Sequence, residues 1–122
     1  MQDYKVKPKY GFFKNFKYAR EGFAEVFKKE TSFKLEIICF VILSFAAVFL
    51  PYPVWAKIVL VSGMLIPLIA ELLNSAIERV VDMVTSEYNE QAKYAKDAAA
   101  AAVMISIFFS VSVWICVIVY FW

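Results

Sequence analysis

The chain contains no histidine, and its 122 residues include only three glycines, four prolines and two cysteines. Without histidine, a His-activated nucleophile and a His-ligated metal site are both excluded. Cys39 and Cys116 lie inside apolar runs and lack the paired spacing of a redox or zinc motif, so we interpret both as packing residues. Neither G-x-x-x-x-G-K-S/T nor G-x-G-x-x-G is present, so any nucleotide phosphate must be held without a standard glycine-rich loop.

Charged residues are scarce too, at 20% of the chain against 62% hydrophobic residues. A soluble domain typically has about 25% charged and about 45–50% apolar residues. This balance indicates a membrane protein. The length allows one domain, residues 1–122, with about three or four spans at most. No apolar run precedes residue 37, so we expect no cleavable signal peptide.

Three segments are long enough, with their flanks, to cross a membrane as helices. We predict spans at about 35–50, 54–84 and 98–122. Pro51 and Pro53 separate the first two, because proline cannot continue a helical hydrogen-bond ladder. The third span contains no charged residue. The predicted fold is therefore an all-α membrane protein with three transmembrane helices.

The basic residues predict the orientation of these spans. Nine of the 13 Lys and Arg residues lie within positions 1–36. Because basic residues accumulate on the cytoplasmic side, we expect the N-terminus and a loop at 85–97 to be cytoplasmic, with Lys57 and the C-terminus outside. The expected location is thus a bacterial inner (cytoplasmic) membrane, crossed more than once.

Residues 1–34 are predicted to contain an amphipathic helix that lies at the membrane interface. Apolar side chains recur there at steps of three or four, with cations mostly beside or opposite them. The apolar set is Phe12, Phe16, Ala19, Phe23, Val26 and Phe27. Such a helix lies in the headgroup layer with its cations toward anionic lipid or phosphate. A plain positive-inside anchor explains the same pattern equally well.

Four polar side chains form a stripe at the end of the second span. Glu71, Asn74, Glu78 and Asp82 are spaced by three, four and four residues, which places them on one helix face. Glu71 lies about 25 Å along the helix from Val54, near the edge of a hydrocarbon core of about 30 Å. Ionisable groups at such depth usually serve a function, here a general base with Mg²⁺-binding carboxylates beyond it. A solvated helix end would explain Asp82 well and Glu71 poorly.

The run Glu71-Leu-Leu-Asn-Ser-Ala-Ile-Glu-Arg-Val-Val-Asp82, with Ser86-Glu-Tyr88 and Ala95-Lys-Asp97-Ala-Ala, resembles the signature of the small prokaryotic diacylglycerol kinases. The resemblance covers nearly the whole chain. It implies a homotrimer whose active sites form between neighbouring protomers at the cytoplasmic interface. It also implies ATP-dependent phosphorylation of diacylglycerol to phosphatidic acid, with Mg²⁺ as cofactor.

The resemblance implies roles for individual residues. Glu71 matches the base that takes the proton from the lipid hydroxyl, Asn74 could orient the reactants, and Glu30 and Glu78 match the Mg²⁺ carboxylates. The positions matched to ATP contacts are Tyr18, Glu30, Glu78, Glu87, Tyr88, Asn89, Lys96 and Asp97. Those matched to the lipid groove are Ser32, Phe33, Lys34, Leu35, Glu36, Lys57, Glu71, Ala100 and Trp114. Ala100 stands where other members have a small polar residue.

Two alternatives stay open at this point. Undecaprenol kinase belongs to the same family, and the run Phe13–Ala19 resembles that branch, whereas Glu36, Ser86-Glu-Tyr88 and Glu90 resemble the diacylglycerol branch. In a non-catalytic membrane assembly subunit, the Glu71 stripe would be an intramembrane salt-bridge or proton site, but no cation in the second span is expected to pair with Glu71. The expected partners are lipid, ATP and the bilayer, and not nucleic acid.

Overall fold

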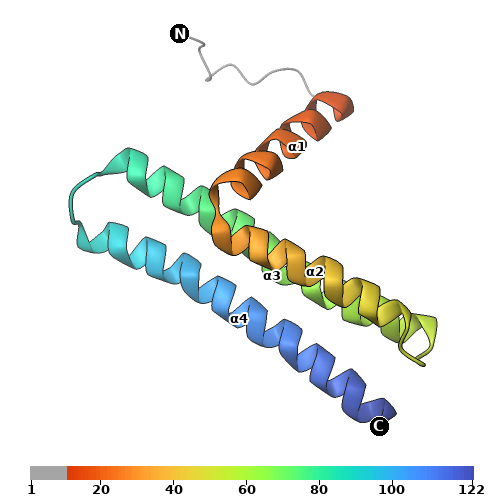
Figure 1. Ribbon diagram of the computed structural model, residues 1–122. Coiled ribbons are helices and arrows are strands. Elements are labelled where there is room, and N and C mark those ends of the chain that lie inside the picture. The colour runs from red at the N-terminus through yellow and green to blue at the C-terminus, as the bar shows by residue number, and fades with distance from the viewer. Residues whose placement is uncertain (1–10) are drawn as a thin grey trace.

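The computed structural model describes residues 11–122, and these form four helices and no strand. The helices are α1 (Phe12–Lys29), α2 (Thr31–Val48), α3 (Val54–Val84) and α4 (Glu90–Phe121). Both α2 and α4 pack along α3, whereas α1 leaves the other helices at an angle (Figure 1). The predicted all-α class is confirmed.

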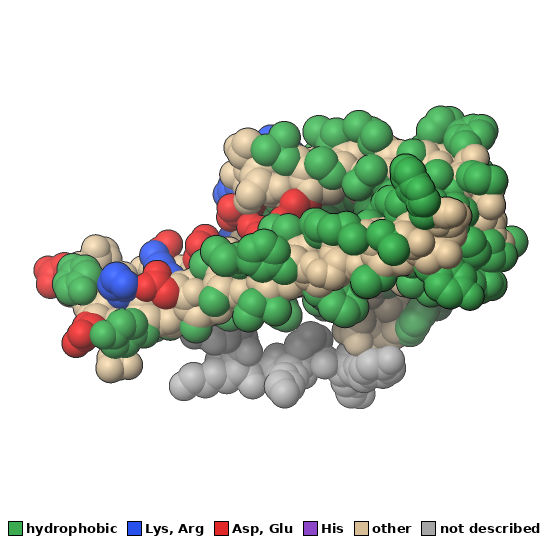
Figure 2. Space-filling view, turned by 90° about the horizontal axis from the view of Figure 1, so that it is seen from below, with side chains coloured by type: hydrophobic (Ala, Val, Ile, Leu, Met, Phe, Trp, Pro, Cys, Tyr) green, Lys and Arg blue, Asp and Glu red, His purple; other side chains and the backbone are tan. Residues whose placement is uncertain are grey.

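Three of the helices, α2, α3 and α4, are long and apolar enough to cross a membrane. This agrees with the three predicted spans. Hydrophobic side chains cover much of their surface, and the acidic and basic side chains gather toward the left half of the view in Figure 2. The chain is therefore apolar over most of its length and polar near one end.

The boundary between the interfacial helix and the first span differs from the prediction of 1–34 and about 35–50. Helix α1 ends at Lys29, and α2 already begins at Thr31. Glu30 separates them with an extended backbone (φ −105°, ψ 109°), so it is the C-cap of α1 and the N-cap of α2. The part of the predicted helix at residues 1–10 lies outside the described residues.

The last helix begins earlier than the predicted 98, so the predicted loop at 85–97 shortens to residues 85–89. Asn89 is the reason, because its side-chain oxygen accepts hydrogen bonds from the backbone N–H groups of Gln91 (2.9 Å) and Ala92 (3.1 Å). This N-cap satisfies two donors that a helix start leaves open. The charged residues after it continue the helix, with Lys93 and Asp97 paired one turn apart.

Two kinds of packing hold the helices together. Val26, Phe33 and Leu68 form the apolar junction of α1, α2 and α3. Between α3 and α4, a Cβ on Gly63 would lie 3.3 Å from Val113, so this glycine permits the two helices to approach closely. Beside the N-terminal end of α3, the rings of Tyr52 and Phe121 stack with centroids 4.6 Å apart.

Candidate active site

The polar stripe begins at Glu71 on α3, which is only 6% exposed. Its Oε1 atom accepts a hydrogen bond from the hydroxyl of Ser32 on α2 at 3.1 Å. Glu30 ends α1 so that the first turn of α2 lies beside the middle of α3. A predicted base and a predicted lipid contact therefore meet directly.

A second pair lies one turn farther along α3. The hydroxyl of Ser75, which is 1% exposed, donates a hydrogen bond to Oε1 of Glu30 at 3.1 Å. Glu78 follows Ser75 by three residues and so lies on the same side of the helix. The Glu30 carboxylate thus meets α3 at Ser75, about one turn before Glu78, the second predicted metal carboxylate.

These two carboxylates fit Mg²⁺ as a ligand set. Within residues 11–122 no group of three or more His, Cys, Asp and Glu side chains is placed to hold a metal. Mg²⁺ does not need such a group, because it commonly binds through one or two carboxylates together with substrate phosphates and water. A metal here would therefore depend on the phosphates of a bound nucleotide.

Two further polar atoms near Glu71 are buried without a hydrogen-bond partner in the described part of the chain, Oδ1 of Asn74 and Oε2 of Glu36. Glu36 is close enough to Glu71 for the two carboxyl groups to interact electrostatically. Buried polar atoms are normally hydrogen-bonded, and an unsatisfied one costs free energy. Both atoms are therefore available to a ligand that reaches this end of α3.

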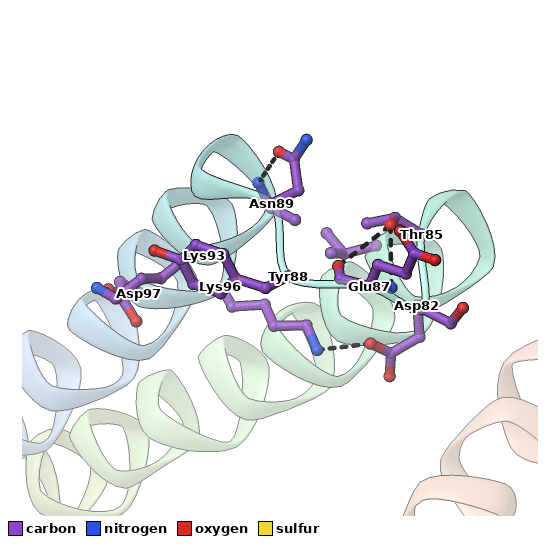
Figure 3. Close-up of a pocket in the computed structure, with 11 residues that line it drawn as sticks. Asp82, Thr85, Glu87, Tyr88, Asn89, Lys93, Lys96 and Asp97 are labelled. Atoms are coloured by element: carbon purple, nitrogen blue, oxygen red, sulfur yellow. Dashed lines mark hydrogen bonds and ion pairs between the residues drawn. The ribbon is translucent and has the colours of Figure 1, made fainter.

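The α3–α4 connection encloses a cavity of about 540 Å³ (Figure 3). Five of the residues predicted to bind ATP line it, namely Glu87, Tyr88, Asn89, Lys96 and Asp97. The Lys96 ammonium lies 2.5 Å from Oδ1 of Asp82, and Lys93 lies 2.6 Å from Oδ2 of Asp97. The side chain of Asn89 is engaged in capping α4. The cavity is thus surrounded by charges of both signs.

Tyr18, also predicted to contact ATP, is exposed on α1 and does not line this cavity. The remaining predicted lipid contacts are scattered. Phe33 is 0% exposed and belongs to the junction core, whereas Leu35 is exposed and Lys34 is half-buried. Phe33 therefore affects the site indirectly, through its packing in the junction of α1, α2 and α3.

Lys57 lies away from the rest of the predicted lipid contacts. It precedes Glu71 by 14 residues, which is about 21 Å of helix. Its ammonium donates a hydrogen bond to the carbonyl of Val48 at 2.6 Å, at the end of α2. On α4, Ala100 is exposed, and the indole N–H of Trp114 is buried without a partner among the described residues. Within the single chain, these three residues are not gathered around Glu71.

Sequence reasoning missed Ser75 as the partner of Glu30. The residue stands in the motif next to Asn74, but its own partner lies 45 positions away on the chain. Helical periodicity gives no information about a contact between residues so far apart in the sequence. The available signal was a small hydroxyl side chain beside the polar stripe of α3.

Comparison with known proteins identifies the family. A family model described as prokaryotic diacylglycerol kinase matches residues 17–118. The chain belongs to the prokaryotic diacylglycerol kinase family. That span includes every predicted site residue, from Tyr18 to Trp114. Membership in this family agrees with three membrane-crossing helices and identifies a membrane protein.

Individual members of the diacylglycerol kinase family are similar at a moderate level. The diacylglycerol kinase of Escherichia coli (strain K12) is 35% identical over 97 residues, which cover 80% of each chain. The diacylglycerol kinase of Helicobacter pylori is 33% identical over 122 residues, covering 93% of this chain and 92% of the relative. The undecaprenol kinase of Bacillus subtilis is 40% identical over 96 residues, covering 77% and 76%.

Proposed function

We propose that this chain is an integral membrane lipid kinase that uses ATP with Mg²⁺ to phosphorylate diacylglycerol, giving phosphatidic acid. One observation carries the proposal: a buried carboxylate, Glu71, is held by Ser32 within one turn of the Glu30–Ser75 pair. Phosphoryl transfer depends mainly on positioning and on neutralised phosphate oxygens. A base beside a pair of metal-binding carboxylates would position the lipid hydroxyl, and the metal held there would neutralise the phosphate oxygens.

In the proposed reaction, the primary hydroxyl of the lipid attacks the γ-phosphorus of ATP. A new oxygen–phosphorus bond forms, the bond from the γ-phosphorus to the β–γ bridging oxygen breaks, and ADP leaves. The hydroxyl proton passes to Glu71, and Asn74 orients the hydroxyl or a phosphate oxygen from the same helix face. Glu30 and Glu78 would hold Mg²⁺, which when bound neutralises phosphate charge.

The cavity at the α3–α4 connection is the proposed position of the nucleotide. Asp82 on α3 and Lys96 on α4 are paired across it, and Lys93 pairs with Asp97 beside it. A polyphosphate entering the cavity could replace Asp82 as the partner of Lys96, since both present anionic oxygens. The location supports access to both substrates, because water-borne ATP and a bilayer lipid can meet only where polar and apolar surfaces adjoin.

The proposal places this polar end at the cytoplasmic face of a bacterial inner membrane and includes assembly as a homotrimer. The basic residues support the orientation. An apolar groove of about 640 Å³ between α3 and α4 supports the assembly, because it leaves Ile69, Leu73 and Phe109 for a neighbour to cover. Asn74 also lines this groove, so a neighbouring chain would lie against the candidate active site.

Undecaprenol is the second candidate substrate, favoured by the 40% identity to an undecaprenol kinase. The two lipids differ chemically at headgroup depth. Diacylglycerol carries ester carbonyls that accept hydrogen bonds, and undecaprenol carries none. The unpartnered oxygen of Glu36 beside Glu71 favours diacylglycerol, because the glycerol backbone of that lipid offers further polar atoms at this depth and the isoprenoid alcohol offers none.

The deciding experiment presents both lipids in one bilayer to the purified protein, with Mg²⁺ and γ-labelled ATP. Labelled phosphatidic acid in excess over labelled undecaprenyl phosphate is the expected result. The Glu71→Gln protein, reconstituted in the same way, measures the background. Absence of label from both lipids with correctly folded protein would refute the kinase proposal.

A further inference from the structure

The position of α1 depends on few contacts. Of the residues in α1, only Val26 is buried, and it lies in the junction core with Phe33 and Leu68. The ring of Phe23 adds an edge-on contact with Phe33 at 5.1 Å. These apolar contacts anchor one end of the helix.

Elsewhere α1 does not pack densely against α3. A groove of about 540 Å³ separates the two helices, with Gly22 on the α1 side and Ala76 on the α3 side. A Cβ on Gly22 would meet no atom within 4 Å. Apolar packing therefore does not fix the rotation of α1 about its own axis.

One ion pair spans this groove. The guanidinium of Arg79 on α3 lies 3.7 Å from Oε1 of Glu25 on α1, and both side chains line the groove. Glu25 also pairs with Lys29, whose ammonium lies 2.6 Å from the same oxygen. The hydrogen bond from Lys29, with a smaller effect of Arg79, holds the pKa of the Glu25 carboxyl below its usual range. Glu25 is therefore ionised at neutral pH and available to Arg79.

The rotation of α1 is coupled to Glu30. The backbone N–H of Glu30 donates to the carbonyl of Val26 at 2.9 Å, so Glu30 follows the last turn of α1. On α3, Arg79 lies four residues after Ser75, which is the partner of the Glu30 side chain. The Glu25–Arg79 and Glu30–Ser75 contacts thus join the C-terminal end of α1 to α3 at two positions one turn apart.

We propose that Arg79 and Glu25 are positioning residues, whose ion pair fixes the rotation of α1 and thereby holds the Glu30 carboxylate beside Ser75 and Glu78. The inference rests on the proposed function, because it assigns Glu30 and Glu78 to Mg²⁺. Neither Arg79 nor Glu25 contacts the reactants in this assignment. Their effect passes through the backbone of α1 to Glu30.

The test measures geometry and activity in the same variants. Spin labels at Asn15→Cys on α1 and Met83→Cys on α3, both exposed, report the α1–α3 distance by double electron–electron resonance. Cys39 and Cys116 are replaced by alanine, and labelled protein is diluted with unlabelled protein so that only distances within one chain are measured. The activity readout is the Mg²⁺ concentration that gives half-maximal rate.

Arg79→Ala and Glu25→Ala should each broaden the distance distribution and raise the half-maximal Mg²⁺ concentration about twofold to fivefold, the range that a half-exposed ion pair supports. Glu21→Ala is the matched control, because among residues 11–122 the partner of Glu21 is Lys17 on the same helix. It should change neither readout. The exchange Glu25→Arg with Arg79→Glu should restore the narrow distribution and most of the Mg²⁺ response.

Three results would overturn the inference. An unchanged distance distribution in Arg79→Ala would show that the pair does not set the rotation of α1. An activity loss in Arg79→Ala with no change in Glu25→Ala would show that Arg79 acts on a substrate directly. Failure of the exchanged pair to recover either readout would show that attraction between the side chains at positions 25 and 79 does not fix the rotation of α1. If the wild-type protein phosphorylates no lipid, the proposed function fails, and the distance measurement still decides whether the pair orients α1.

Discussion

Ser32 on α2 donates a hydrogen bond to Glu71 on α3 across 3.1 Å, although 39 positions separate them along the chain. The bond fixes one carboxylate oxygen of a side chain that is only 6% exposed. It leaves the second oxygen for another partner, since the hydroxyl engages Oε1 alone. A base that must take a proton from a lipid hydroxyl needs this combination of fixed orientation and a free acceptor.

Glu71→Gln should abolish turnover while folding and nucleotide binding persist. The amide keeps the size and polarity of the side chain and can still accept the Ser32 hydrogen bond, but it cannot take the proton. A general base commonly contributes about 10²–10⁴-fold, so kcat should fall by at least about 10². Steady-state rates, ATP binding and thermal unfolding of the same preparation provide the measurement. A kcat near that of the wild type would remove Glu71 from the role of base.

Glu30→Ala and Glu78→Ala should each raise the Mg²⁺ requirement. Loss of either carboxylate leaves the cation with fewer protein oxygens. The expected shift is at least about tenfold, because loss of even an outer-shell partner costs about 10–100-fold in metal affinity. Initial rates are measured against free Mg²⁺ at constant ATP, with Glu21→Ala as the control carboxylate. Activity that excess Mg²⁺ never restores, with unchanged MgATP affinity, would indicate a structural role.

Lys96→Met should raise the KM for ATP about tenfold, with little change in the KM for lipid. The methionine keeps the apolar stem and removes the ammonium that is proposed to leave Asp82 for a phosphate. Lys93→Met is the comparison, because Lys93 lines the same cavity but pairs with Asp97 on its own helix. Equal effects of the two substitutions would mean that only the overall charge of the cavity matters.

Glu36→Ala should reduce the preference for diacylglycerol over undecaprenol, mainly through a lower kcat/KM for diacylglycerol. A site that bonds a polar substrate group discriminates against substrates lacking that group. Glu36→Gln should keep most of the preference, because its amide keeps a polar group of the same size at this position. The ratio is measured with both lipids in one bilayer. A wild-type preference for undecaprenol would transfer the assignment to the second candidate.

Much of the fold was predictable because its causes are local. Hydropathy over about 20 residues identifies a membrane-crossing helix, and three such segments are found in the structure. The boundary errors have local causes as well. An asparagine N-cap at Asn89 moved the start of the last helix from 98 to 90, and a break at Glu30 moved the start of the first span from about 35 to 31.

The candidate site also combines features that local sequence predicts with contacts that only the packing of the helices decides. Helical periodicity alone placed Glu71, Asn74 and Glu78 on one face, and the motif around them identified the family before any contact was known. The spacing of a single helix could not show which residues from other helices approach that face. Ser75 illustrates the limit, because its hydrogen-bond partner Glu30 lies outside α3 and 45 positions away in the sequence.

By itself, the sequence determined the membrane class, the three spans and the polar stripe, because each depends on the spacing and hydropathy of neighbouring residues. Tertiary structure alone decided that Ser32 meets Glu71, that Ser75 meets Glu30, and that Arg79 reaches Glu25. These contacts join residues 39, 45 and 54 positions apart, the last as the difference between 79 and 25. Their existence depends on how α1 and α2 pack on α3, which is set by the whole junction core and by no local pattern.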